Sequence, residues 1–256
     1  MRNVIIMFLI SISISTPELL SQGTAGEKAL YESRRIVDMP NAGILEKGAF
    51  AIHAIAYQQG GIMLQLNAAP FTDFNMGLSF SGTNIVGFGD VNWQSIPGIH
   101  LRYRILNETN TIPAFLIGVN TQGRGDYNRN DNRFITPSPG VFLAASKNYQ
   151  WLLGTVAFHA GINYSFETKS DDRIPNVYVG FEHSIGKAVS LNFEYNSTLN
   201  DGNKNYMESK GLLNMALRWS LAKGITLELQ ARDIFKNIKV NDSFTRSICL
   251  EYINTF

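Results

Sequence analysis

Apolar and polar residues alternate with a period of two along most of the chain from Gly48 onward. Near the middle of the chain, for example, Phe158 and Ile162 fall on one face of an extended segment and His159 falls on the other. Side chains of a β-strand point alternately to its two faces, so this period indicates strands, and no window shows the 3.6-residue period of an amphipathic helix. The pattern therefore predicts an all-β protein. About twelve strands are expected, at residues 48–58, 61–68, 73–81, 98–106, 112–120, 139–147, 152–166, 175–184, 189–197, 211–221, 225–233 and 244–255.

The last of these strands ends the chain on an aromatic residue. In SICLEYINTF, Ile248, Leu250 and Tyr252 share one face. Asn254 interrupts that face before the chain ends at Phe256. Such a strand is typical of bacterial outer-membrane β-barrels, although ten residues of this kind also fit the last strand of a secreted β-sandwich. For a barrel, we expect Phe256 to serve as the assembly signal for the barrel-assembly machinery.

The second face of the strands is polar but carries little charge. It consists mostly of Gly, Ser, Asn, Thr and Ala, whereas the exposed face of a soluble strand is rich in Lys, Glu and Arg. Charged residues make up 17% of the chain, against about 25% in a typical soluble domain. This composition indicates a crowded barrel lumen, with lipid against the apolar face. In hydrocarbon every backbone N–H and C=O needs a partner within the protein, so we expect the last strand to pair with the first.

The connections between the predicted strands are sorted by length. Those that follow even-numbered strands are short, with IGKA and LAKG among them. Outer-membrane barrels combine short periplasmic turns with long external loops. The sorting predicts a single antiparallel up-and-down transmembrane barrel over residues 48–256, with Phe256 on the periplasmic side. Apart from a tight turn at 58–60, the connections on the opposite side are long, at 82–97, 121–138, 167–174, 198–210 and 234–243.

The N-terminal residues predict export. Arg2 is followed by the apolar run VIIMFLISISIS, which is too short to span a bilayer as a helix, and then by Pro17. Residues 1–21 are therefore expected to be a signal peptide, and the mature protein is expected to reach the bacterial outer membrane and contact its lipid. For residues 22–47 we expect a periplasmic N-terminal segment. Entry of this segment into the barrel is the alternative.

Several longer segments resemble a known family. RRIVDMPNAGILEKGAF, NIVGFGD and NTQGRGDY, followed by SPGVFLAASKNY, FHAGINYSFE and LRWSLAKGITLELQARDIFKN, are similar to sequences of predicted outer-membrane proteins that are grouped with the YjbH-like, exopolysaccharide-associated barrels. The resemblance covers nearly the whole chain after the expected signal peptide. It implies an outer-membrane β-barrel with a link to surface polysaccharide, and it implies no functional residues.

Charged residues on the predicted polar face are the first candidates for a functional site. They include four arginines and four glutamates, a neutral set that favours internal salt bridges. Arg218 and Glu228 are placed to pair across the hairpin around LAKG. The same residues would line a polar channel for a hydrophilic solute. The lumen-lining residues expected on this basis are His100, Arg102, Arg104, Glu182, Glu194, Arg218, Glu228 and Arg232, with Glu251 beside them.

Catalysis and metal binding have less support. His159, Asn163 and Ser165 share one strand face, but residues two apart on a strand are about 7 Å from one another, too far for a hydrogen-bonded triad. The loop from Asn120 to Phe134 lacks the Gly and Glu of an EF-type Ca²⁺ loop, and Cys249 is the single cysteine. We therefore expect no catalytic residues, no metal and no cofactor. A net charge of +1 gives no reason to expect a nucleic-acid partner.

Three functions follow from these observations. The leading hypothesis is a porin-like or secretion-associated channel for a hydrophilic solute or polysaccharide. The alternative is a structural or assembly barrel with an occluded lumen and no transport. A surface lipid hydrolase is the third, less favoured, because the polar residues that it needs fall on the face away from lipid.

Overall fold

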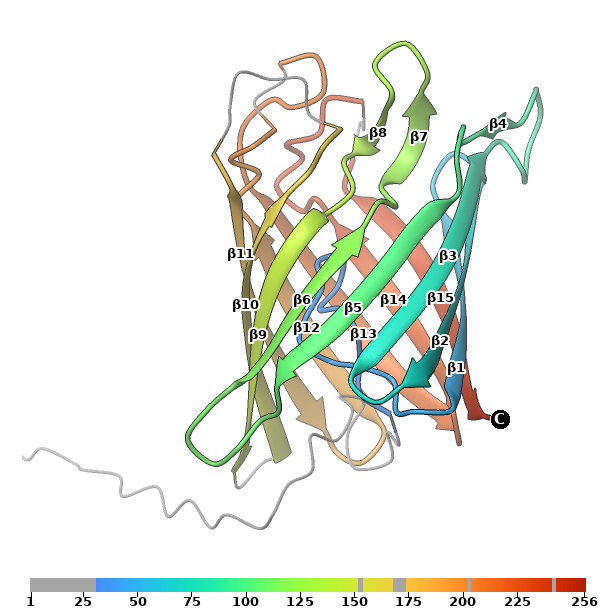
Figure 1. The fold of residues 1–256 in the computed structure, drawn as a ribbon. Coiled ribbons are helices and arrows are strands. Elements are labelled where there is room, and N and C mark those ends of the chain that lie inside the picture. Colours follow the sequence, from blue (N-terminus) through green and yellow to red (C-terminus); the bar gives the residue numbers. More distant parts are fainter. Residues whose placement is uncertain (1–30, 152–153, 168–173, 202–203, 241–242) are drawn as a thin grey trace, which may run out of the picture.

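Twelve strands of the described chain form a closed antiparallel barrel (Figure 1). The computed structural model describes residues 31–151, 154–167, 174–201, 204–240 and 243–256, so the predicted signal peptide and residues 22–30 lie outside the described part. β1 (Ala49–Tyr57) pairs with β15 (Thr245–Thr255), which closes the sheet as predicted. The other barrel strands are β2 (Gly61–Phe71), β3 (Phe74–Thr83), β5 (Gly98–Leu106), β6 (Ala114–Asn120), β9 (Gly140–Trp151), β10 (Gly154–Tyr164), β11 (Asn176–Ile185), β12 (Val189–Asn196), β13 (Leu212–Ala222) and β14 (Ile225–Arg232).

Every predicted strand has one counterpart in the barrel, and the differences lie at the ends. β2 continues to Phe71, and β10 already ends at Tyr164. Three short strands are additional: β4 (Asn92–Trp93), β7 (Arg124–Asn128) and β8 (Arg133–Thr136) form within segments that the sequence predicts as long loops. Their alternation is too short to stand out from polar loop sequence. In the described ranges, no helix is long and apolar enough to cross a membrane.

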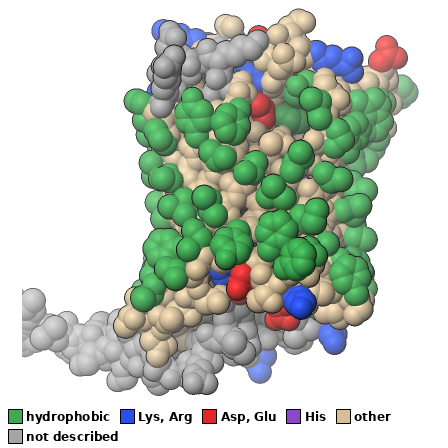
Figure 2. All heavy atoms as spheres, viewed as in Figure 1, with side chains coloured by type: hydrophobic (Ala, Val, Ile, Leu, Met, Phe, Trp, Pro, Cys, Tyr) green, Lys and Arg blue, Asp and Glu red, His purple; other side chains and the backbone are tan. Residues whose placement is uncertain are grey.

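The two faces of the wall differ as the alternation predicts. Phe158 is 51% exposed on the outside of the barrel, whereas the adjacent His159 is 5% exposed on the inside. Figure 2 shows apolar side chains spread over the outer wall between the two ends of the barrel. An exterior of this kind suits lipid, because an apolar surface of this extent is rarely left in water. Exposed apolar residues of the wall include Leu64, Leu66, Leu78, Val179, Leu229, Ile248 and Leu250.

The connections are sorted between the two ends as expected. The short ones, such as 72–73, 186–188 and 223–224, lie at the end where the chain terminates (Figure 1). The opposite end carries the β7–β8 hairpin and the long connections.

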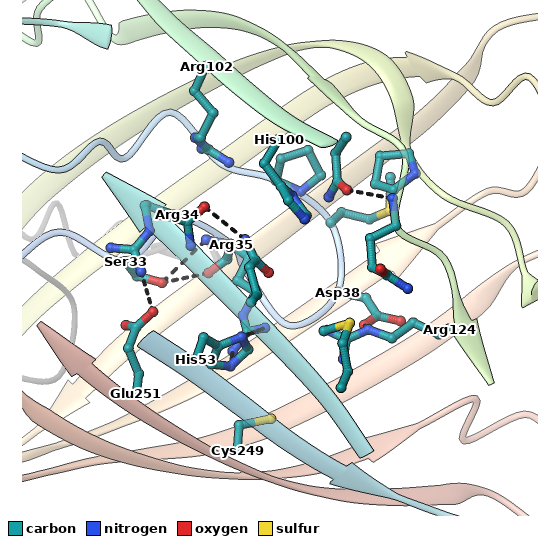
Figure 3. Close-up of a pocket in the computed structure, with 18 of the residues that line it drawn as sticks. Ser33, Arg34, Arg35, Asp38, His53, His100, Arg102, Arg124, Cys249 and Glu251 are labelled. Atoms are coloured by element: carbon teal, nitrogen blue, oxygen red, sulfur yellow. Dashed lines mark hydrogen bonds and ion pairs between the residues drawn. The ribbon is translucent and has the colours of Figure 1, made fainter. Parts of the chain in front are cut away.

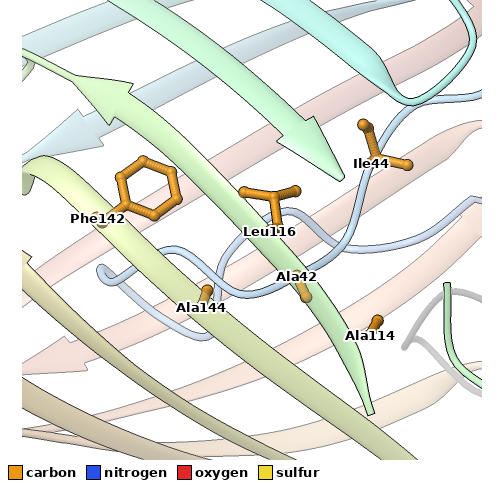
Figure 4. Packing of buried hydrophobic residues seen from close by; sticks show 6 residues of the cluster. All are labelled: Ala42, Ile44, Ala114, Leu116, Phe142 and Ala144. Atoms are coloured by element: carbon orange, nitrogen blue, oxygen red, sulfur yellow. The ribbon is translucent and has the colours of Figure 1, made fainter. Parts of the chain in front are cut away.

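The segment before β1 lies inside the barrel. We call residues 31–47 the N-terminal plug. Its Ile36 and Val37 are fully buried, and Figure 4 shows Ala42 and Ile44 packed against the inner face of β6 and β9. Gly180 on β11 makes room for it, since a β-carbon at that position would lie 2.5 Å from Cγ2 of Ile36. The described part of the segment expected to be periplasmic therefore takes the alternative position within the lumen.

The long connections pack together over one mouth of the barrel. Arg133 of β8 forms an ion pair with Asp201 at 2.8 Å, and its guanidinium lies 4.0 Å from the centre of the Tyr206 ring. Burial raises the pKa of the Tyr206 phenol, and the carboxylate of Asp131, which accepts its hydrogen bond, raises it further. Burial also raises the pKa of Glu167, which accepts hydrogen bonds from the backbone N–H groups of Phe134 in β8 and of Ser138 just after it. These contacts hold the loops in place above the lumen.

The seam between β1 and β15 runs from Ala49 opposite Thr255 to Tyr57 opposite Ser247. Just beyond the seam, the N–H of Phe256 donates to the carbonyl of Gly48 at 2.8 Å. The ring of Phe256 lies 5.4 Å from that of Phe50 on the first strand. The role of Phe256 as an assembly signal stays a prediction, and its contacts show that it also extends the seam.

The arrangement of the two ends predicts where protease cuts on intact cells. Arg129 is exposed at the tip of the β7–β8 hairpin, and Lys187 is exposed in a short turn at the opposite end. Trypsin added to intact cells should cleave after Arg129 and spare Lys187, and both should be cut once the outer membrane is permeabilised. Fragment masses check this, with Arg129→Gln as the control that removes the first cut alone. Cleavage after Lys187 on intact cells would mean that the barrel has the opposite orientation.

Deleting Phe256 should reduce the yield of folded barrel. The deletion removes the hydrogen bond to Gly48 and the ring contact with Phe50 at the seam. The measurement is the fraction of protein that migrates in the heat-modifiable, folded form after expression. Phe244→Ala, an exposed aromatic just before the start of β15, is the matched control and should fold at the wild-type level. Equal yields for the two variants would argue against a special role for the terminal residue.

Candidate functional site

The N-terminal plug enters the lumen as a tight loop. The N–H of Ile36 donates to the carbonyl of Met39 at 2.9 Å. Arg35 and Pro40 form an isolated antiparallel bridge across the same loop. Successive backbone amides of such a turn point to one side and together form a site for an anion. The plug therefore presents backbone donors to the wall as well as side chains.

Glu194 on β12 occupies this ring of donors. Its Oε2 atom accepts hydrogen bonds from the backbone N–H groups of Val37, Asp38 and Met39 at 2.8–2.9 Å. Its Oε1 atom accepts a hydrogen bond from the side-chain amide of Asn214 at 2.7 Å. A carboxylate that is 1% exposed needs partners of this kind, because burying an ion without them is costly. Glu194 thus anchors the plug from one side of the wall.

Two arginines on β5 bind the plug from the facing side. Arg102 donates hydrogen bonds to the carbonyls of Asn41 and Gly43, the latter at 3.0 Å. Arg104 forms an ion pair with Glu32, with Nη1 and Oε1 3.1 Å apart. The carbonyl oxygens of the plug are therefore the acceptors for wall arginines, just as its amides are the donors for Glu194.

Arg218 on β13 joins the wall network to the plug. It lies directly opposite Glu228 of β14, and its Nε atom is 2.6 Å from Oε2 of that carboxylate, which confirms the pair predicted across this hairpin. Its Nη1 atom is 3.3 Å from the carboxylate of Glu182 on β11. A further N–H of the same guanidinium donates to the carbonyl of Ile36 at 2.8 Å. One arginine thus ties three elements together.

Charged side chains of the plug reach the wall and the external hairpin. Asp38 lies between Arg232 of β14 at 3.0 Å and Arg124 of β7 at 2.8 Å. On the other side of the plug, Arg34 forms an ion pair with Glu251 of β15. Because Arg124 belongs to the β7–β8 hairpin, the plug is connected to the loops over the mouth as well as to the strands.

A cavity of about 90 Å³ remains between the plug and the inner wall (Figure 3). We call it the arginine cavity. It has room for a handful of water molecules and none for the passage of a larger solute. His53 lines it from β1 and His100 lines it from β5, where its Nε2 atom lies 2.8 Å from Oγ of Ser79. The charged residues around it are Arg34, Arg35, Arg102, Arg124, Arg218, Asp38, Glu228 and Glu251.

All eight residues expected to line the lumen point into the barrel, and the structure divides them into two groups. Arg218 pairs with both Glu182 and Glu228 within the wall, and it also donates to the plug. Arg102, Arg104, Glu194 and Arg232 contact the plug, and His100 faces the arginine cavity. The alternation along the strands does not single out Arg34, Arg35 or Arg124, because they lie before the first strand or in a predicted loop, yet all three line the same cavity.

The residues considered for catalysis are separated. His159 faces Ser146, with Nδ1 and Oγ 2.8 Å apart, and Asn163 donates to the carbonyl of Pro139. The same Ser146 hydroxyl accepts the N–H of Ala42 in the plug. The Nε2 atom of His159 has no hydrogen-bond partner among the described residues, so these contacts lack the third group that would orient a base.

Removing the guanidinium of Arg218 should destabilise the barrel. Arg218→Met abolishes the ion pairs that Arg218 forms with Glu228 and Glu182, and also its hydrogen bond to the carbonyl of Ile36. Breaking a buried network of this kind costs about 3 kcal/mol or more, so the urea midpoint for unfolding should fall clearly. Arg246→Met, at an exposed arginine, is the control and should leave the midpoint unchanged. Combining Arg218→Met with Glu228→Gln should cost less than the sum of the two changes, because the residues interact; additive losses would contradict the pairing.

Comparison with known proteins finds likenesses among solved structures alone. No family model and no curated protein matches it, so the resemblance to YjbH-like barrels has no family match behind it. Among solved structures, the chain is similar to the KdgM porin, with 9% identity over 80% of this chain and 98% of that chain at a TM-score of 0.46. It is also similar to the outer-membrane protein Omp33 of Acinetobacter baumannii, with 8% identity over 81% of this chain and 97% of that chain at a TM-score of 0.45. The likeness to the NanC porin has 6% identity over 81% of this chain and 99% of that chain, at a TM-score of 0.44. These likenesses carry no argument about function.

Proposed function

We propose that the chain is an outer-membrane β-barrel that forms a narrow channel for a hydrophilic solute, closed by the N-terminal plug in the state described above. The observation that carries this proposal is a polar, charged inner wall within a barrel whose outer wall is apolar. A closed barrel leaves no unpaired sheet edge and suits the hydrocarbon of a membrane. The predicted signal peptide and the sorted connections support the outer membrane as its location.

The polar wall supports passage of a hydrophilic solute. A lumen that only had to be filled could be packed with apolar side chains, as an ordinary core is. Here the inner face holds buried arginines, glutamates, asparagines and serines, whose hydrogen-bonding groups need water, a solute or the plug as partners. With the plug displaced, Arg102, Arg104 and Arg232 would face an aqueous passage.

A barrel that stays closed is the second candidate function. It is supported by the number and kind of plug contacts, which include ion pairs through Glu32, Arg34 and Asp38 and the three amides held by Glu194. Such a protein would serve as a structural or assembly component of the membrane. The narrower proposal of a link to exopolysaccharide rests on the sequence resemblance alone.

Conductance in planar bilayers separates the two candidates. The wild-type barrel should show few openings. Replacement of residues 31–45 by a Gly-Ser segment of equal length should give sustained channels. Glu194→Gln, which removes the charge that holds three plug amides, costs about 1.5–3 kcal/mol of plug binding and should raise the open probability about tenfold or more.

Folding of each variant is checked by heat-modifiable migration before the conductance measurement. Asp233→Asn serves as a control, because Asp233 is a buried carboxylate that contacts loop backbone rather than the plug. A folded barrel that lacks the plug and still fails to conduct would rule out the channel and leave the occluded barrel.

A further inference from the structure

The arginine cavity carries more positive than negative charge. Its lining contains five arginines but three carboxylates, an excess of two positive charges with histidines neutral. Within the lining, Arg34 pairs with Glu251, Arg124 with Asp38 and Arg218 with Glu228. Arg35 shares Glu228 with Arg218, at 3.8 Å. The excess of positive charge therefore falls on Arg35 and Arg102.

Guanidinium groups around the cavity also have unused hydrogen-bond donors. Nη1 of Arg34, Nε of Arg102 and Nη1 of Arg124 are buried and have no acceptor among the described residues. Arg34 and Arg124 are each 9% exposed. Figure 3 shows the three side chains around the same space, from the plug, from β5 and from β7.

Arg102 is the clearest case. It has no carboxylate within ion-pair distance in the described ranges. It donates to two plug carbonyls and its guanidinium lies 5.5 Å from the centre of the Phe142 ring. Arg102 is partly buried, with its Nε atom enclosed. Neutral carbonyls do not balance the charge of its guanidinium, and enclosing a charge without a counterion is costly. An anion in the cavity would supply the missing charge and the missing acceptors together.

We infer that the arginine cavity is a binding site for an oxyanion, meaning a carboxylate, phosphate or sulfate group, held by Arg34 and Arg102 with Arg124 at its outer side. A guanidinium presents a planar fork of donors that matches two oxygens of one such group, so oxyanions should bind better than chloride. The cavity volume of about 90 Å³ limits the bound part to one small group. The site requires only the plugged state, so a barrel that stays occluded would hold it equally.

Calorimetric titration of the purified, folded chain in detergent tests this inference. Inorganic phosphate and acetate should each bind with a saturable signal, and chloride at the same ionic strength should not. Arg102→Gln and Arg34→Gln should each weaken phosphate binding about tenfold or more, since each removes hydrogen bonds to a charged group. Arg102→Lys, which keeps the charge but loses the fork, should fall between Arg102→Gln and the wild type.

Arg246→Gln is the control. Arg246 is an exposed arginine on β15 that does not line the cavity, so its replacement removes one positive charge without touching the plug. This variant should bind phosphate as the wild type does, and every variant is first shown to fold by heat-modifiable migration. Absence of saturable binding by any oxyanion, or an equal loss in Arg246→Gln and Arg102→Gln, would overturn the inference.

Titration with two further ligands shows whether the bound anion is a free ion or part of a larger solute. If glucose 1-phosphate or glucuronate binds more tightly than the free ion, the site recognises the anionic group of a larger solute. If inorganic phosphate binds more tightly, the site holds a small free ion. Either result supports the site, and neither changes with the outcome of the conductance experiment.

Discussion

Closure of the sheet between β1 and β15 is the constraint on which the rest of the structure depends. Because the seam satisfies the backbone groups of both edge strands, no edge is left open to lipid or to another chain. The side chains of the outer face are then free to be apolar throughout. Every polar side chain that the alternation places on the other face is enclosed, and the lumen becomes the one place where those groups can find partners.

The backbone of the plug supplies many of these hydrogen-bond partners. Wall arginines need acceptors and wall carboxylates need donors, and an irregular backbone supplies both in alternation. Carbonyls of the plug serve Arg102 and Arg218, while three consecutive amides serve Glu194. A helix or strand in the same place would already have used these groups in its own hydrogen bonds. The irregular conformation of residues 31–47 is therefore part of why they fit this wall.

The sequence predicted what depends on local patterns. A period of two is visible within each strand, so the strands could be predicted from it, together with the face of each that is apolar. The need for a closed sheet in lipid then predicted that the last strand pairs with the first. The pair between Arg218 and Glu228 was predictable because the two residues are equidistant from one tight turn. The contact between Val37 and Glu194 was not, since more than 150 positions separate them and a backbone amide leaves no mark in the sequence.

The cavity was hidden for a related reason. Its arginines come from the plug, from β5 and from a hairpin that the sequence showed only as a polar loop, so no single segment looked basic. The charges expected in the lumen were balanced when counted on the strands alone. The imbalance appears only when Arg34, Arg35 and Arg124 are counted with the strand residues around the cavity, because Asp38 is the one carboxylate that comes with them.

The contacts of the plug bear on how a solute would use this lumen. On the wall, Arg102 and Arg218 each donate hydrogen bonds to carbonyl oxygens of the plug, so those oxygens occupy positions that oxygens of a passing solute would take. A solute rich in hydroxyl and carboxylate oxygens could therefore replace the plug on the same arginines at little cost in hydrogen bonding, whereas an apolar solute would leave these groups unpaired. An anion in the arginine cavity would oppose displacement of the plug, provided that Arg34 of the plug and Arg102 of the wall both bind it. A ligand that bridges the two binds the closed arrangement best and so stabilises it.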